Sequence, residues 1–190
     1  IDMVILATIS PDFFCMPSTA CVVANNLGII NKPAFDISAA CSGFIYLLAL
    51  AKSLIESKAY KNILIVGAEK LSSIIDMQDR STCVLFGDGA GAAIISATED
   101  REAAILDVRV ASNGAYQDFL MTPGCGSRNP ANAGMLEERL QFSKMKGNET
   151  FKIAVKTLTN DGIEIMKANN LTKDDIDFFI PHQANSRIIS

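Results

Sequence analysis

The stretch Ala34-Phe-Asp-Ile-Ser-Ala-Ala-Cys41-Ser-Gly-Phe-Ile-Tyr-Leu-Leu-Ala-Leu-Ala51 decides how the rest of the chain is organised. An apolar run of strand length ends in small residues, and an apolar run of helix length follows, with Cys41 at the junction. Cys41 is therefore expected at a helix N-terminus, where free backbone N–H groups and the helix dipole stabilise a thiolate and lower the thiol pKa. The small neighbours of Cys41 suit a tight turn that leaves the sulfur open to a substrate.

The run that follows Cys41 also predicts how the fold is layered. Residues 44–54 are apolar on nearly all sides of a helix, and only Lys52 and Ser53 interrupt them. A helix of this kind is normally buried on every side, and this one is too short to span a bilayer. We therefore expect a layer of structure above it and another below it, both of them sheets.

Composition excludes several functional classes. The chain has 190 residues, a formal net charge of -4 and 49% hydrophobic residues. An acidic chain of this size holds one large or two small cores and lacks the concentrated basic surface that a general nucleic-acid binder needs. Its five cysteines have neither the paired spacing of a zinc site nor that of a disulfide scaffold, so reduced thiols and no metal are expected.

The ends of the sequence and its hydropathy support a further expectation. The chain starts inside a strand-like run and stops inside an apolar helical start, so we expect it to be an internal piece of a longer protein. Neither a secretory leader nor a run of about 20 apolar residues is found. A cytoplasmic protein with no membrane contact is expected.

Strand-like and helix-like runs alternate along the chain in the manner of a parallel α/β sheet. A charged segment at 98–101 divides the chain into an expected first half, 1–98, and an expected second half, 99–190. The elements expected are strands in 1–7, 34–37, 62–68, 92–96, 104–111 and 176–180, a helix at 18–27 capped by Ser18, a helix capped by Asn148, a capped turn at 172–175 and a last helix after Asn185.

The pattern Gly87-x-Gly89-x-Gly91 is open to two interpretations. It is similar to a nucleotide-binding loop, but it leads into an expected strand and opens no helix, which contradicts a dinucleotide fingerprint. Close packing of neighbouring strands is the preferred interpretation. A nucleotide-binding module remains an alternative, and it would bind ATP or NAD even after replacement of Cys41.

His182 is the only histidine, so any imidazole chemistry must use it. It follows the expected strand 176–180, at the edge where α/β proteins place their sites. Cys41 and His182 can meet if the two strands that precede them end on the same side. The alternatives are a buried structural cysteine, a structural histidine, and an N-cap role for the nearby Asn185.

Five motifs, taken together and in this order, resemble one known family. They are Phe35-Asp-Ile-Ser-Ala-Ala-Cys41-Ser-Gly-Phe44, Asp79-Arg80, Phe86-Gly-Asp-Gly-Ala-Gly-Ala92, Gly147-Asn148 and Pro181-His-Gln-Ala-Asn-Ser-Arg187-Ile188. The family is β-ketoacyl-acyl carrier protein synthase III, of the thiolase superfamily. The resemblance implies a thiolase-like layered α/β/α/β/α fold with two related halves, incomplete in this chain, with Cys41 in 1–98 and His182 in 99–190.

The resemblance also implies an activity. Such an enzyme starts type II fatty acid synthesis, taking an acyl group from acetyl-CoA onto Cys41 and condensing it with malonyl-acyl carrier protein to give acetoacetyl-acyl carrier protein. It needs no cofactor and acts as a homodimer. The family's catalytic asparagine lies in a later motif that this chain lacks, so the 190 residues alone are expected to be inactive.

Several residues acquire roles through this resemblance alone. Cys41 and His182 would be catalytic, and Arg187 would contact the acidic carrier protein. Met16 stands where many relatives have a phenylalanine that closes the acyl pocket across the dimer interface. Methionine is thinner and more flexible, so the pocket could accept slightly longer or branched starters. The remaining substrate-binding residues would be Arg80 at the nucleotide end of CoA, Asn185 at the pantetheine arm, and Leu71, Phe86 and Phe151 in the pocket walls.

Two other functions stay open at this stage. One is a related priming or condensing synthase of a polyketide or quinolone pathway. The other is a noncatalytic protein that only binds acyl carriers. Transfer of an acetyl group to Cys41, followed by product formation, would separate catalysis from binding.

Overall fold

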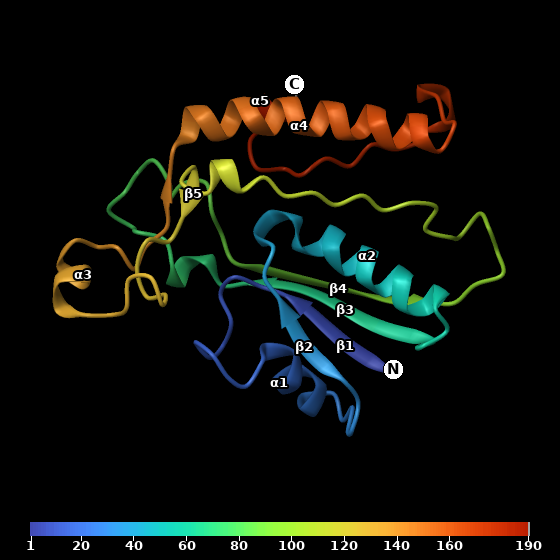
Figure 1. Cartoon of the computed structure of the whole chain (residues 1–190), viewed down its shortest axis with the longest axis horizontal. Helices are drawn as coiled ribbons and strands as arrows, with labels where there is room; N and C mark the ends of the chain where they lie inside the picture. The colour runs from blue at the N-terminus through green and yellow to red at the C-terminus, as the bar shows by residue number, and fades with distance from the viewer. Residues whose placement is uncertain (190) are drawn as a thin grey trace. The chain divides into compact units, whose positions relative to one another are not determined.

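The computed structural model describes residues 1–189, which form two compact units (Figure 1). Unit 1 comprises Ile1–Lys70 and Asp88–Val110, and unit 2 comprises Leu71–Gly87 and 111–189. Each unit is described by itself. The relation between the expected halves 1–98 and 99–190 stays a prediction. Within residues 1–189, none of the helices combines the length and the apolar character of a membrane-spanning segment.

Unit 1 is built on a mixed four-stranded sheet. The strand order is β2-β1-β3-β4, in which β1 lies parallel to β2 and to β3, while β4 runs antiparallel to β3 (Figure 1). This sheet confirms four of the expected strands and the α/β class. Their bounds are β1 (Met3–Ala7), β2 (Ala34–Ile37), β3 (Asn62–Glu69) and β4 (Gly89–Ser96).

One helix covers each face of this sheet. Successive side chains of a strand point to opposite faces, so neighbouring residues of β1 pack against different helices. On one face, Ile5 packs with Leu47 of α2 (Gly43–Glu56) in the larger core cluster. On the other face, Leu6 packs with Ala20 of α1 (Thr19–Asn26). The Ser18 cap of α1 is confirmed, since its side chain accepts a hydrogen bond from the backbone N–H of Cys21.

The expectation that α2 is buried on every side is wrong for this chain. Only Gly43, Leu47 and Ala51 are buried, whereas Phe44 and Ile45 are 39% and 44% exposed. Within unit 1 the sheet packs on one face of α2 and no second layer covers the other face. An all-round apolar sequence therefore indicates where a helix could be covered, but the layers present decide what is buried.

Unit 2 contains one long helix and several short elements. The long helix is α4 (Gly147–Ala168), which begins after Lys146 and not after an Asn148 cap, as the sequence had suggested. The expected turn at 172–175 is confirmed with a reciprocal capping box between Thr172 and Asp175. The short elements are η2 (Leu71–Ser73), η3 (Gly114–Tyr116), β5 (Leu120–Met121), α3 (Ala133–Glu137), β6 (Lys144–Met145), η4 (Lys173–Asp175) and α5 (Ser186–Ile189).

Two expected strands do not form. The segments 104–111 and 176–180 pair with no strand among residues 1–189, and Phe178 and Ile180 are both 85% exposed. Apolar runs of the right length were correctly found, but a strand also needs a partner for its backbone groups. The strand expected after the glycine pattern is confirmed, since β4 begins at Gly89 and no helix opens there. The close strand packing expected at these glycines is wrong, because a Cβ atom at Gly87, Gly89 or Gly91 would meet nothing within 4 Å.

Candidate active site

Cys41 lies in a short turn between β2 and α2, as the sequence predicts. The turn is the single 3₁₀ turn η1 (Ala40–Ser42), and α2 starts directly after it at Gly43. Ala40 has φ of 45°, in the left-handed region that residues other than glycine rarely adopt. Backbone strain of this kind is concentrated at functional sites, where the surrounding structure maintains it.

Gly43 fixes the position of this turn on the sheet. A Cβ atom at Gly43 would lie 2.7 Å from Cβ of Ala7, well inside van der Waals contact. The start of α2 therefore rests directly on the last residue of β1, and only glycine allows that approach. Cys41 is held two residues before this contact.

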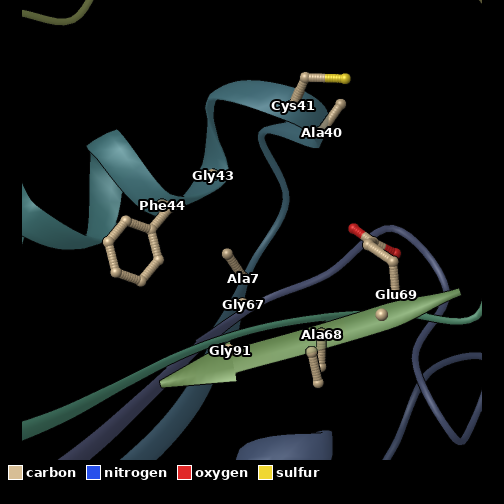
Figure 2. A pocket seen from close by; sticks show the side chains of 11 residues that line it. Ala7, Ala40, Cys41, Gly43, Phe44, Gly67, Ala68, Glu69 and Gly91 are labelled. Atoms are coloured by element: carbon tan, nitrogen blue, oxygen red, sulfur yellow. The ribbon is translucent and has the colours of Figure 1, made fainter. Parts of the chain in front are cut away.

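A cavity of about 260 Å³ opens beside Cys41, entirely within unit 1 (Figure 2). Cys41 and Phe44 border it on the helix side, and the ends of three strands border it on the other. Apart from Glu69, its strand residues are small ones that the sheet register brings together, since Ala7 pairs with Gly67, which in turn pairs with Gly91. Cβ atoms at Gly89 and Gly91 would meet nothing within 4 Å, so the missing side chains leave open space.

The Cys41 thiol has a raised pKa, which contradicts the lowered pKa expected from the helix N-terminus. Desolvation by the surrounding protein is the largest cause, even though the residue as a whole is exposed, and the negative charge of Glu69 adds to it. The backbone N–H of Cys41 itself acts in the opposite direction. Loss of solvent around the sulfur thus outweighs the field of the helix end.

Glu69, at the end of β3, is the charged neighbour that the sequence analysis missed. Its carboxylate accepts hydrogen bonds from the backbone N–H of Ile9 and from the hydroxyl groups of Thr8 and Ser10. A signal was present, because a carboxylate that directly follows a buried apolar strand lies at the edge where α/β sheets carry their sites.

His182 lies in unit 2, in an exposed segment that follows the unpaired residues 176–180. Asn185 caps the following turn, since its side-chain oxygen accepts from the backbone N–H of Arg187 at 3.0 Å. This is the N-cap role that the sequence analysis gave as the alternative for Asn185. Cys41 and His182 belong to different units, and their pairing stays a prediction.

The other predicted site residues are distributed over both units. Met16 lies in the loop before α1 in unit 1, where it is 79% exposed and does not line the Cys41 cavity. The rest lie in unit 2 and their roles stay predictions; they are Leu71 in η2, exposed Arg80, half-buried Phe86, half-buried Phe151 in α4 and exposed Arg187 in α5.

No group of three or more histidine, cysteine, aspartate or glutamate side chains in residues 1–189 is arranged to hold a metal ion. Within the Cys41 cavity, Cys41 and Glu69 are the two ionisable residues. The chemistry that this cavity supports is therefore that of a thiol beside a carboxylate.

Comparison with known proteins gives one consistent result. The model of the 3-oxoacyl-[acyl-carrier-protein] synthase III family matches residues 35–114, a range that includes the Cys41 turn and β4. The β-ketoacyl-[acyl-carrier-protein] synthase III of Campylobacter concisus is 65% identical over 190 residues, and that of Campylobacter fetus is 62% identical over 189 residues. All of this chain is matched in both cases, and it spans 56% and 57% of those proteins.

Solved structures agree with this result. The crystal structure of 3-oxoacyl-[acyl-carrier-protein] synthase III from Aquifex aeolicus VF5 superimposes with a TM-score of 0.87 at 44% identity. The match covers 99% of this chain and 56% of that protein. It confirms the expected thiolase-like α/β fold for the part of that fold that the chain contains. Over its whole length the chain is therefore similar to proteins of the β-ketoacyl-acyl carrier protein synthase III family.

Proposed function

We propose that this chain carries the nucleophile of a condensing enzyme that starts type II fatty acid synthesis. Acetyl-CoA would supply the acyl group and malonyl-acyl carrier protein would supply the two-carbon extension. The active form would be a homodimer that uses no cofactor. The observation that carries the proposal is Cys41, which lies on a strained turn before α2 at the edge of a cavity bordered mostly by small residues.

In the first step the sulfur of Cys41 attacks the carbonyl carbon of acetyl-CoA. A new C–S bond forms to Cys41, the C–S bond to CoA breaks, and CoA leaves as the free thiol after taking up a proton. Only the thiolate is an effective nucleophile, and the raised pKa of Cys41 keeps the free thiol mostly protonated at neutral pH. The thiol must therefore lose its proton in the complex with acetyl-CoA, and His182 is the proposed acceptor.

In the second step malonyl-acyl carrier protein replaces CoA in the site. The bond to its carboxylate breaks, CO2 leaves, and the electron pair remains as an enolate on the thioester. The enolate carbon attacks the acetyl group, and the thiolate of Cys41 is released with acetoacetyl-acyl carrier protein as product. Hydrogen-bond donors at the thioester oxygen are needed while that charge develops, and His182 is proposed as one of them.

The remaining contacts of the substrates are proposed for unit 2. Arg80 would bind the nucleotide end of CoA, Asn185 the pantetheine arm and Arg187 the acidic carrier protein. Leu71, Phe86 and Phe151 would form walls of the acyl pocket, and Met16 of the partner subunit would close its far end. Cytoplasmic location is part of the same proposal.

The test is acyl transfer in the full-length protein. Incubation with acetyl-CoA should add one acetyl group per chain, detected by intact mass spectrometry and mapped to Cys41 by peptide digestion. Malonyl-acyl carrier protein should then remove the acetyl group and give acetoacetyl-acyl carrier protein. Cys41→Ser should abolish both reactions, whereas Cys21→Ser, at an exposed cysteine of α1, should leave them unchanged.

Other results would refute the proposal. Binding of acyl carrier protein without any acetyl transfer would identify a noncatalytic binding protein. ATP or NAD affinity that survives Cys41→Ala would favour a nucleotide site at Gly87 to Gly91. For the 190-residue chain alone we expect no condensation, because the family's catalytic asparagine lies in a motif outside it.

A further inference from the structure

Glu69 lies at the cavity edge, and the proposed condensation gives it no task. It is the last residue of β3 and pairs with Gly89 of β4 in the sheet. Its Oε1 accepts from the backbone N–H of Ile9 at 2.9 Å. Its Oε2 accepts from the hydroxyl of Thr8 at 3.2 Å and from that of Ser10 at 2.5 Å. One carboxylate thus holds three consecutive residues that directly follow β1.

Further bonds close this arrangement into a network. The Ser10 hydroxyl accepts from the backbone N–H of Lys70 at 2.7 Å, and the backbone N–H of Ser10 donates to the Thr8 hydroxyl at 3.0 Å. Thr8 is only 6% exposed, and its own N–H donates to the carbonyl of Ile37 at 3.1 Å. The ends of β1, β2 and β3 are therefore tied together beside the Cys41 turn.

The network bears on the cavity through Ala7. Ala7 precedes Thr8, lines the cavity, and supports the start of α2 at Gly43. Any movement of residues 8–10 would shift Ala7 and hence the surface on which the Cys41 turn rests. Hydrogen bonds to a charged acceptor are about twice as strong as neutral ones, which suits Glu69 to resist such a movement.

We propose that Glu69 is a positioning residue for the Cys41 site: its carboxylate fixes residues 8–10 against the ends of the strands and so holds the support of the Cys41 turn. The proposal rests on the proposed function only in naming Cys41 as the acyl-bearing group. The nearby charge gives a second, independent readout. Cys41 and Glu69 are the ionisable residues that line the cavity, and the negative charge of Glu69 disfavours the thiolate.

The experiment compares three variants of the full-length protein. Glu69→Gln keeps the shape but loses the charge and part of the accepting capacity. Ser10→Ala keeps the charge and loses one hydrogen bond. Glu56→Gln is the matched control, because Glu56 is an exposed glutamate on α2 paired with Lys52.

Two measurements separate the effect of position from that of charge. In Glu69→Gln, alkylation of Cys41 by iodoacetamide at pH 7 should be about threefold faster, with its pH midpoint lowered, because a solvent-screened charge has a modest effect. Amide exchange at Ile9 should be about tenfold faster in Glu69→Gln and should also rise in Ser10→Ala, since the opening of this turn becomes easier. Ser10→Ala should keep the wild-type alkylation midpoint, and Glu56→Gln should match the wild type in both measurements.

The proposal is overturned if amide exchange at Ile9 in Glu69→Gln matches that in Glu56→Gln, whatever the rate of alkylation. If Glu69→Gln does not fold, Ser10→Ala decides: unchanged exchange at Ile9 overturns the proposal, and faster exchange supports it. Neither measurement needs catalysis. A protein that fails to accept acetyl groups, but shows both effects, would refute the proposed function while leaving the role of Glu69 intact.

Discussion

Two apolar runs of strand length have opposite outcomes in this molecule. In unit 1, Val4, Ile5 and Leu6 are completely buried in β1, which has a strand on each side. In unit 2, the run 176–180 forms no strand, and its Phe178 and Ile180 are 85% exposed. The difference shows that an apolar run becomes part of a core only when neighbouring strands satisfy its backbone and cover its side chains.

The same contrast separates the two proposed catalytic residues. Cys41 stands on a turn fixed by the sheet and by Gly43, whereas His182 follows the uncovered run in unit 2. Cys41 is thus held by contacts within unit 1.

The largest expected effect comes from the same substitution made in both runs of the comparison. Ile5→Ala, at a fully buried position of β1, should lower the free energy of unfolding by about 2–5 kcal/mol. Ile180→Ala, at an exposed position, should change it by less than about 0.5 kcal/mol. Urea denaturation followed by circular dichroism gives both values, and equal losses at the two sites would break the comparison.

A smaller effect is expected at the contact between α2 and β1. Gly43→Ala places a methyl group against Ala7 and should cost about 1–3 kcal/mol, as overpacking does. It should also slow alkylation of Cys41, because the turn must move. The double variant with Ala7→Gly should recover most of the loss. Gly89→Ala, where a Cβ atom meets nothing within 4 Å, is the control that should leave stability nearly unchanged.

The anchor between α1 and β2 gives a third test within unit 1. The carboxylate of Asp36 accepts from the backbone N–H groups of Thr19 and Ala20 at 2.7 and 2.8 Å. Asp36→Ala should lower the free energy of unfolding by about 1–2 kcal/mol, as the loss of a helix cap does. Ser18→Ala removes the 3.3 Å bond that the Ser18 hydroxyl accepts from the backbone N–H of Cys21 and the 3.1 Å bond that it donates to the Cys21 sulfur. Both are longer than the bonds of Asp36 and involve no charged group, so the substitution should cost less. A larger loss for Ser18→Ala in thermal unfolding would contradict this ranking.

The smallest effect is expected in unit 2, where a polar contact fixes the loop that carries α3. Arg139 donates two hydrogen bonds to the carboxylate of Asp76, and these hold the pKa of Asp76 far below its usual range. Because that pKa is lowered on folding, the contact stabilises fully above the unfolded pKa of about 4 and is lost as pH falls through the lowered value.

Asp76→Asn should therefore loosen this loop at pH 7 and remove its sensitivity to acid. Amide exchange at Gly124, whose N–H donates to the carbonyl of Leu140, measures the loosening locally. Arg128→Gln, at an exposed arginine elsewhere in the same connection, is the control. Wild-type exchange at Gly124 in Asp76→Asn would show that the ion pair does not hold the loop.

Much of unit 1 could be predicted because its signals are local. The small residues around Cys41, the Ser18 cap and the apolar strands each act over a few residues, and each appears where the sequence places it. In unit 2 the capped turn at 172–175 was predicted for the same reason. The motifs of the family were equally readable, since their order along the chain is a property of the sequence.

The sequence by itself determined the similarity to one family, the α/β class and the placement of Cys41 on a turn before a helix. Only the tertiary structure decided that α2 is covered on one face, that 176–180 stays unpaired, that the Cys41 pKa is raised and that Glu69 borders the same cavity. The physical reason is the separation along the chain over which each interaction acts. Backbone preference and side-chain periodicity act between near neighbours, whereas solvation, burial and charge depend on whatever part of the chain packs alongside.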